Sequence, residues 1–144
     1  MPQLSPARTG LDVGFDGAGI PECFAPLKGG AWRSIPGAKE FPFEDSQFEV
    51  VILSAAVVNL TTVKESHRVL KPDGMLYFIV PEKSARQDGF TMPEIYAIVR
   101  EGYNIVGVER PKWWKFGLGG RTLTISARKK NWRSLSGATF RPYV

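Results

Sequence analysis

The chain has 144 residues, of which 43% are hydrophobic, and this size suits a single domain with a packed core. Its first ten residues contain no apolar run of signal-peptide length, and its longest apolar stretch, residues 50–58, is about half of what a membrane span requires. These features exclude the membrane class, and we expect a soluble protein of the cytoplasm. The single cysteine, Cys23, excludes an internal disulfide and has no neighbouring cysteine at metal-ligand spacing.

Charge is distributed unevenly along the chain. All 14 acidic residues lie at or before Glu109, whereas residues 110–144 carry nine Lys and Arg side chains and no acid. The formal net charge is +5, so a strongly basic carboxyl-terminal quarter follows a slightly acidic remainder. Such asymmetry indicates either a polyanionic partner or a solvated tail.

Two short strands and a helix are predicted in the first part of the chain. Residues 11–14, LDVG, form an apolar strand that runs into a glycine-rich turn at 15–19. Residues 20–27 follow as a helix, because Pro21 stands near its first position, where a missing N–H costs nothing. Residues 31–35, AWRSI, are predicted as the second strand.

The middle of the chain predicts a strand, a helix and a strand. Residues 48–53, FEVVIL, are apolar with little alternation, which is typical of a central parallel strand covered on both faces. Thr62 and Glu65 have the spacing of a capping box, which predicts a helix over 62–71. Residues 75–80, MLYFIV, are a second strand of the same buried kind, so we expect a right-handed parallel crossover.

A second helix and two further strands are predicted after this unit. Thr91 and Glu94 repeat the capping-box spacing, which predicts a helix over 92–101. Residues 104–109 and 121–129 are predicted strands, and the alternation in the second of them indicates an exposed or edge face. The loop between them has hairpin length, so we expect this pair to be antiparallel.

These elements in this order predict an α/β fold. We expect a Rossmann-like, mostly parallel sheet with a C-terminal antiparallel strand pair. The fold is expected to occupy one domain, residues 1–130, followed by a basic C-terminal tail, residues 131–144.

Two segments resemble the class I S-adenosylmethionine-dependent methyltransferase family. FPFEDSQFEVVILS, residues 41–54, is similar to the family's Pro-Phe, acidic turn and Phe-Asp-Val-Val at its fourth strand. HRVLKPDGMLYFIVPE, residues 67–82, is similar to the Arg-Val-Leu-Lys-Pro-Gly-Gly turn into the fifth strand, with Asp73 in place of the first glycine. The resemblance spans roughly residues 10–130, and it implies the family's fold and S-adenosylmethionine as cofactor.

The resemblance also implies where the methyl donor binds. The donor is a nucleoside, so its site needs a turn after the first strand that only glycine allows to approach closely. Asp12, Gly14, Asp16, Gly17 and Gly19 resemble the family's acid-x-Gly-x-Gly-x-Gly loop, with Asp16 where a glycine is usual. We predict these five residues as the cofactor-binding residues.

Other parts of the donor site depart from the family pattern. Related nucleotide sites place a ribose carboxylate about twenty residues beyond the glycine turn, but Arg33 stands near that place and residues 23–39 contain no acid. The family's acid before the Pro-Phe turn is replaced by Pro36-Gly37. The roughly thirty residues between the first strand and the Pro-Phe turn are too few for two more strands and a helix. The sequence therefore predicts a sheet shortened by about one β-α unit.

No catalytic residue and no metal site are predicted. Residues 55–60, AAVVNL, lack the His and Glu-His that many small-molecule members of the family carry in this region. His67, the single histidine, lies on the apolar face of a predicted helix and fits a packing role. Methyl transfer proceeds mainly by bringing donor and acceptor together, so the reaction does not require such groups.

Three functions are left open by the sequence. The first is a methyltransferase with an unidentified small-molecule or macromolecular acceptor, and the second is a non-catalytic interaction module that has lost the donor site. The third is a nucleic-acid binder that uses residues 110–144, where Trp113, Trp114 and Phe116 alternate with cations. These aromatic side chains equally fit a loop packed over the sheet edge. An exposed edge left by a missing strand favours a homo-oligomer.

Overall fold

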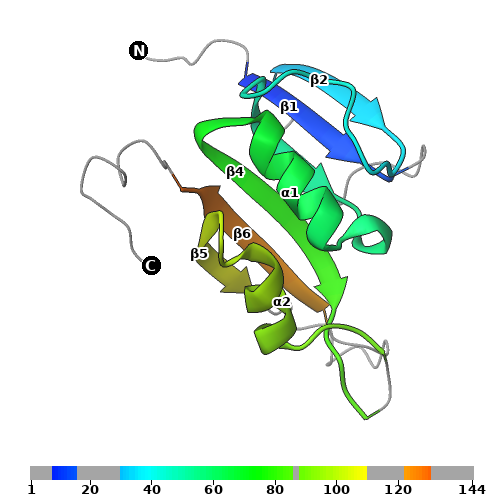
Figure 1. Ribbon diagram of the computed structural model, residues 1–144. Coiled ribbons are helices and arrows are strands. Elements are labelled where there is room, and N and C mark those ends of the chain that lie inside the picture. The colour runs from blue at the N-terminus through cyan, green and yellow to red at the C-terminus, as the bar shows by residue number, and fades with distance from the viewer. Residues whose placement is uncertain (1–7, 16–29, 86–87, 110–121, 131–144) are drawn as a thin grey trace.

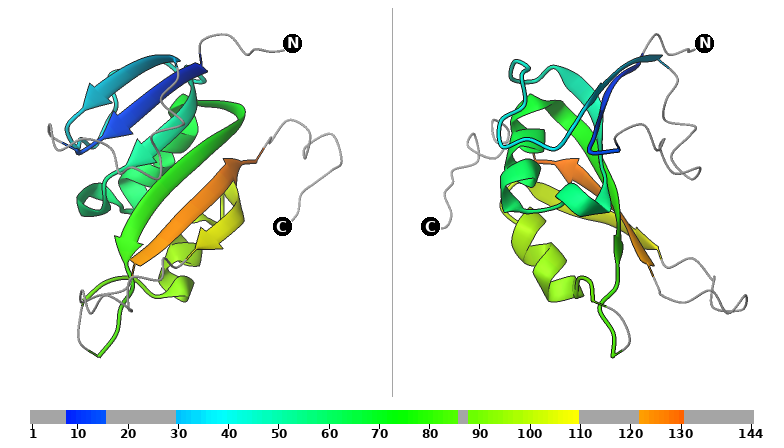
Figure 2. Two further views of the ribbon diagram at one scale, coloured as in Figure 1. Left: turned by 180° about the vertical axis from the view of Figure 1, so that it is seen from behind. Right: turned by 90° about the vertical axis from the view of Figure 1, so that its right-hand side faces the viewer.

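The computed structural model describes residues 8–15, 30–85, 88–109 and 122–130. They form a six-stranded sheet in the order β2-β1-β3-β4-β6-β5. The strands are β1 (Arg8–Val13), β2 (Gly30–Ile35), β3 (Phe48–Leu53), β4 (Leu70–Pro81), β5 (Tyr103–Glu109) and β6 (Thr122–Lys129). Two helices, α1 (Leu60–Val69) and α2 (Met92–Val99), lie on the same face of the sheet (Figure 1, Figure 2).

The strand pairing confirms the predicted fold class. β2, β1, β3 and β4 pair in parallel, and β6 runs antiparallel to both of its neighbours, β4 and β5. β2 pairs directly with β1, where Asp12 lies opposite Ser34, and it forms one edge of the sheet. The six-stranded sheet of this 144-residue chain agrees with the predicted loss of about one β-α unit.

The main core lies between the sheet and the two helices. Fully or almost fully buried side chains on this face of the central strands are Val51, Leu53, Leu76, Phe78, Val80, Leu123 and Ile125. On the opposite face, Val50 and Ile52 are buried in a smaller cluster. The prediction of two buried faces holds for β3, where Glu49 alone is exposed, but it is wrong for β4, whose Tyr77 and Ile79 are half-buried.

Helix α1 begins two residues before its predicted start. Its N-cap is Asn59, whose side chain accepts a hydrogen bond of 3.0 Å from the backbone N–H of Thr62. The hydroxyl of Thr62 in turn accepts a bond of 3.2 Å from the backbone N–H of Asn59. Thr62 is thus the third residue of the helix and not its cap. The helix ends at Val69 because Leu70 is already extended and starts β4.

Helix α2 has the predicted capping box of Thr91 and Glu94. The backbone N–H of Thr91 donates to the Glu94 carboxylate over 2.8 Å, and the Glu94 N–H donates to the Thr91 hydroxyl over 3.3 Å. The helix ends at Val99, two residues short of the predicted end.

The turn before the second half of β4 explains one feature of the family resemblance. Asp73 has a φ of 65°, which is the left-handed conformation that glycine adopts at least cost. This conformation favours glycine, the residue that the resembling motif has at this position.

Several predictions lie outside the described residues. These are the helix over 20–27, the loop between β5 and β6, the tail at 131–144, and the proposed donor contacts Asp16, Gly17 and Gly19. The division into a domain and a tail stays a prediction. Among the described helices, none has the length and apolar character needed to cross a membrane.

Candidate functional site

The carboxyl ends of β1, β2 and β3 meet at one edge of the sheet, which is where ligands bind in open α/β sheets. A cavity of about 590 Å³ lies there between the loop after β2 and the start of α1. Its lining residues are Gly37, Ala38, Lys39, Ala56, Val57, Asn59, Leu60, Thr61 and Thr62. We call it the carboxyl-edge cavity. Its volume falls in the range of roughly 300–1,000 Å³ that is usual for small-molecule sites.

Gly14 takes the conformation that was predicted for the turn after the first strand. Its φ is 85°, and its backbone N–H donates to the carbonyl of Ile35 over 2.8 Å. A Cβ atom on Gly14 would lie 2.7 Å from Cγ1 of Val57, and a Cβ atom on Gly37 would lie at the same distance from it. The close approach that these two glycines allow is therefore made by the Val57 side chain, which also lines the carboxyl-edge cavity.

Asp12 lies in the last part of β1 and is 5% exposed. Its Oδ2 accepts a hydrogen bond of 2.9 Å from the hydroxyl of Ser34 on β2. This bond holds the ends of the two strands together. Of the five predicted cofactor-binding residues, the structure describes Asp12 and Gly14 alone, and their contact with the donor stays a prediction.

The position expected for the ribose carboxylate is occupied by a cation. Arg33 is exposed on β2, and its guanidinium carbon lies 5.3 Å from the centre of the Phe43 ring. This distance is that of a cation–π contact. Within the described residues after β2, no carboxylate precedes Glu40. The cavity has the volume of a small-molecule site, but none of its lining residues is an acid that could accept hydrogen bonds from the ribose hydroxyls.

Arg68 on α1 fixes the loop between β2 and β3, which leads away from the cavity. Its guanidinium donates to the carbonyls of Phe41 and Phe43 over 2.9 and 2.8 Å. It also forms salt bridges of 2.9 Å with Asp45 and with Glu65. Glu65 accepts the backbone N–H of Phe41 over 2.8 Å. The hydrogen bond from Arg68 lowers the pKa of Glu65, so this carboxylate stays charged.

His67 lies in a second cavity, between the two helices, and its surroundings support the predicted packing role. Its ring is perpendicular to that of Tyr103, with the centroids 5.3 Å apart. Burial, together with the positive charge of Lys129, lowers the pKa of His67 to about 4, so the ring is neutral at physiological pH. In the part of the chain that the structure describes, no group of three His, Cys, Asp or Glu side chains is arranged to hold a metal.

Sequence reasoning missed Ser34, Val57 and Ala56 as residues around the edge of the sheet. Serine, valine and alanine are common in any fold, so their types carry no signal. The one available signal was the pair of glycines, Gly14 and Gly37, because glycine marks places where another group approaches the backbone closely.

Known proteins match this chain in part of its sequence and in its fold. The sequence family described as "Methyltransferase domain" matches residues 34–78, which run from the end of β2 into β4. A search of curated protein sequences gave no significant match.

Solved structures share the fold over most of the chain. A putative sarcosine dimethylglycine methyltransferase from Galdieria sulphuraria has a TM-score of 0.65 at 13% identity, over 87% of this chain and 79% of its own. A putative methyltransferase from Bacillus halodurans has a TM-score of 0.65 at 17% identity, over 89% and 95%.

A third structure contains a bound product of the donor. It is the 1,6-didemethyltoxoflavin-N1-methyltransferase of Burkholderia thailandensis with 1,6-didemethyltoxoflavin and S-adenosylhomocysteine. Its TM-score is 0.64 at 18% identity, over 88% of this chain and 72% of its own. The chain therefore matches the methyltransferase-domain family at residues 34–78 and shares the fold of solved S-adenosylmethionine-dependent methyltransferases over most of its length.

Proposed function

We propose that the chain is an S-adenosylmethionine-dependent methyltransferase that binds the nucleoside of its donor in the carboxyl-edge cavity. The observation that carries this proposal is the position of the cavity, beyond the ends of β2 and β3 and against the start of α1. Ligands of open α/β sheets bind at this edge. The donor, when bound, supplies an electrophilic methyl group to a nucleophilic acceptor, which is unidentified.

The residues around the cavity have distinct roles in this proposal. Gly37, Ala38 and Ala56 carry little or no side chain, so they leave room for a planar base against the backbone. Val57 forms part of the wall and is held there by its contacts with Gly14 and Gly37. The protein's contribution to the rate is to bind and orient the donor and the acceptor, since approximation accounts for much of the catalysis in such transfers.

Isothermal titration with S-adenosylmethionine and S-adenosylhomocysteine tests this proposal. We expect sub-millimolar binding of both, and a loss of about ten-fold or more in Ala56→Trp, because a large side chain there fills the cavity. Ala31→Trp is the matched control, since Ala31 is exposed near the opposite end of β2. Asp12→Ala and Gly14→Val are expected to weaken binding if the first turn also contacts the donor.

A non-catalytic interaction module is the second candidate. It is favoured by Asp12, whose carboxylate is buried against Ser34, and by Val57, which fills the space beside Gly14. In this role β2 is the docking surface, because no strand of the described part pairs with its outer edge, and an unpaired edge accepts a strand from another chain. A second copy of this chain would make a homo-oligomer. If the folded protein gives no heat of binding with S-adenosylmethionine or S-adenosylhomocysteine, the result would favour this candidate.

Binding of nucleic acid through residues 110–144 is the third proposal. In the described part of this region, Lys129 donates to the carbonyl of Leu70 over 2.6 Å, and Lys130 donates to that of Arg100 over 2.9 Å. Both ammonium groups therefore stabilise the fold by bonding to backbone carbonyls. A steep loss of RNA affinity with added salt is the expected signature. An unchanged affinity after removal of residues 131–144, which follow β6, would contradict a role for the tail. We also propose a cytoplasmic location.

A further inference from the structure

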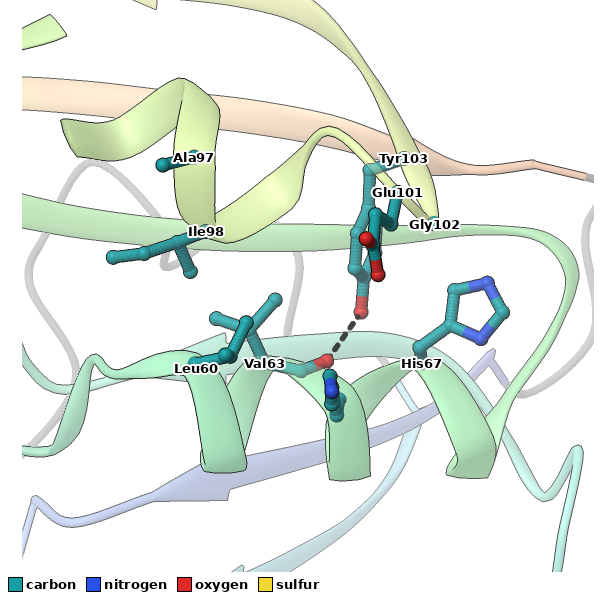
Figure 3. A pocket seen from close by; sticks show the side chains of 9 residues that line it. Leu60, Val63, His67, Ala97, Ile98, Glu101, Gly102 and Tyr103 are labelled. Carbon is teal, nitrogen blue, oxygen red and sulfur yellow. Dashed lines mark hydrogen bonds between the residues drawn. The ribbon is translucent and has the colours of Figure 1, made fainter. Parts of the chain in front are cut away.

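A second cavity lies between helices α1 and α2, on the face of the sheet that both helices cover (Figure 3). Its volume is about 260 Å³, and we call it the interhelix groove. Leu60 lines both cavities, and from there the groove extends along α1 to Gly102 at the start of β5. The groove is therefore distinct from the carboxyl-edge cavity for most of its length.

One part of the groove is apolar. Leu60 and Val63 of α1 lie opposite Ala97 and Ile98 of α2 (Figure 3). Leu60 is 48% exposed, so part of its side chain is in contact with water. An apolar group of a ligand that displaced this water would gain hydrophobic stabilisation.

The far end of the groove is formed by Tyr103, His67 and Gly102. The Tyr103 hydroxyl donates to the carbonyl of Val63 over 3.1 Å, so its polar atom is already engaged (Figure 3). The His67 ring packs edge to face against the ring of Tyr103. A Cβ atom on Gly102 would be 2.5 Å from Cδ2 of His67. Glycine at this position lets the imidazole pack directly on the backbone. This end of the groove is neutral, because burial keeps His67 uncharged at physiological pH.

Two opposite charges line the groove. Lys64 on α1 and Glu101 after α2 are both exposed and both belong to the lining. Within the described parts of the chain, neither of them forms a salt bridge, whereas Arg68, one turn from Lys64, forms two. The groove thus presents a cation and an anion beside an apolar surface.

We propose that the interhelix groove binds a small zwitterion with an apolar body, namely a free apolar α-amino acid. Its carboxylate pairs with Lys64, its ammonium pairs with Glu101, and its side chain packs among Leu60, Val63 and Ile98. The volume agrees with this size, because about 260 Å³ is below the roughly 300–1,000 Å³ of sites for drug-sized ligands.

Charge complementarity separates this class from others. A phosphate or another anion would be attracted by Lys64 but repelled by Glu101. An amine without a carboxylate would be attracted by Glu101 but repelled by Lys64. Like charges brought together in this way oppose binding. A fully apolar ligand would fit the walls, but it would gain nothing from either charge.

The test is a calorimetric titration of the whole chain with L-leucine, 4-methylpentanoate and isopentylamine. The three share the same branched body and differ in their charged groups. We expect saturable binding of L-leucine, and binding weaker by about ten-fold or more for each single-charge analogue, because each lacks one charge-assisted hydrogen bond. Analogues that bind as well as L-leucine, or no binding of L-leucine by the folded protein, would overturn the proposal.

Matched variants locate the site. Lys64→Met and Glu101→Gln are expected to weaken the affinity for L-leucine by about ten-fold or more. The controls Lys83→Met and Glu109→Gln, at exposed positions outside the groove, are expected to leave this affinity unchanged. Equal affinity in all four variants would refute the location.

This inference is independent of the proposed donor site. Ala56→Trp is expected to retain L-leucine binding even though it blocks the carboxyl-edge cavity, because Ala56 does not line the groove. A protein that binds L-leucine but no S-adenosylhomocysteine would therefore support the groove while contradicting the proposed function. Loss of L-leucine binding in folded Ala56→Trp would count against a separate site.

Discussion

The interior of the sheet and its β2 edge differ in how many neighbouring strands hold them. β4 is paired on both sides, by β3 and by β6, and its Leu76, Phe78 and Val80 are fully buried. β2 is paired on one side by β1, and its Ile35 is half-buried. The segments that resemble the methyltransferase family lie mainly in the firmly held part. The residues that resemble the family therefore coincide with the packed interior of the sheet.

The largest expected effect comes from the same substitution in the interior of the sheet and at its β2 edge. Ile125→Ala on β6 empties a fully buried site and is expected to cost about 3–5 kcal/mol of the free energy of unfolding. Ile35→Ala on β2 is expected to cost about 1–2 kcal/mol, because its side chain is half-buried. Urea unfolding measures both values. Equal losses of unfolding free energy would show that the interior and the β2 edge are equally well packed.

The next effect tests the contact between the first turn and Val57. Gly14→Ala is expected to cost about 2–4 kcal/mol, because its φ of 85° strains an L residue and the new Cβ atom meets Val57. Val57→Ala in the same background should recover the part due to the clash and leave the part due to φ. A double-mutant cycle by urea unfolding separates the two. Strictly additive losses would mean that the two residues do not touch.

Arg68 is expected to have a smaller effect on stability. Arg68→Ala removes the bonds to Phe41, Phe43, Asp45 and Glu65, and should cost about 2 kcal/mol. Arg100→Ala is the control, at the exposed C-cap of α2, and should stay within about 0.5 kcal/mol of the parent. Thermal unfolding compares them, and indistinguishable midpoints would argue against the network around Arg68.

The last predicted effect depends on pH. Burial lowers the pKa of folded His67 from 6.5 to about 4, so the unfolded chain takes up a proton between these values while the folded chain does not. Stability is therefore complete above pH 6.5 and falls as the pH drops toward 4.

His67→Phe keeps a ring against Tyr103 and removes the titrating group. Between pH 7 and pH 4 we expect the parent to lose about 2 kcal/mol more than the variant, a value that allows for the partial contact of the ring with water. Urea unfolding at the two pH values gives the difference. A parallel pH dependence of parent and variant would show that His67 is not protected by burial.

Much of the fold was predictable from local patterns. β3 is apolar except for Glu49, and the second half of β4 is an unbroken apolar run; both patterns are typical of strands inside a parallel sheet. The start of α1 was predicted too late because Asn59 and Thr62 form a reciprocal cap that overlaps the Thr62 and Glu65 spacing. Glu65 has the right spacing but bonds instead to Phe41 and Arg68.

The candidate sites were less predictable, because they depend on contacts between distant segments. The resemblance pointed to Asp12 and Gly14, but the bond of Asp12 to Ser34 depends on the register of β1 and β2. The contact of Val57 with Gly14 follows from the packing of the turn after β3. The groove between the helices involves no motif, since Lys64 lies on α1 and Glu101 lies in the turn after α2, on unrelated stretches of sequence.

The most direct test of the proposed function is an NMR titration of the labelled chain with S-adenosylhomocysteine. We predict saturable shifts of the backbone amides of Gly37, Ala38 and Ala56 at the carboxyl-edge cavity, with the amides of Lys64 and Glu101 unchanged. A well-dispersed spectrum in which the amides of Gly37, Ala38 and Ala56 do not respond would contradict the account.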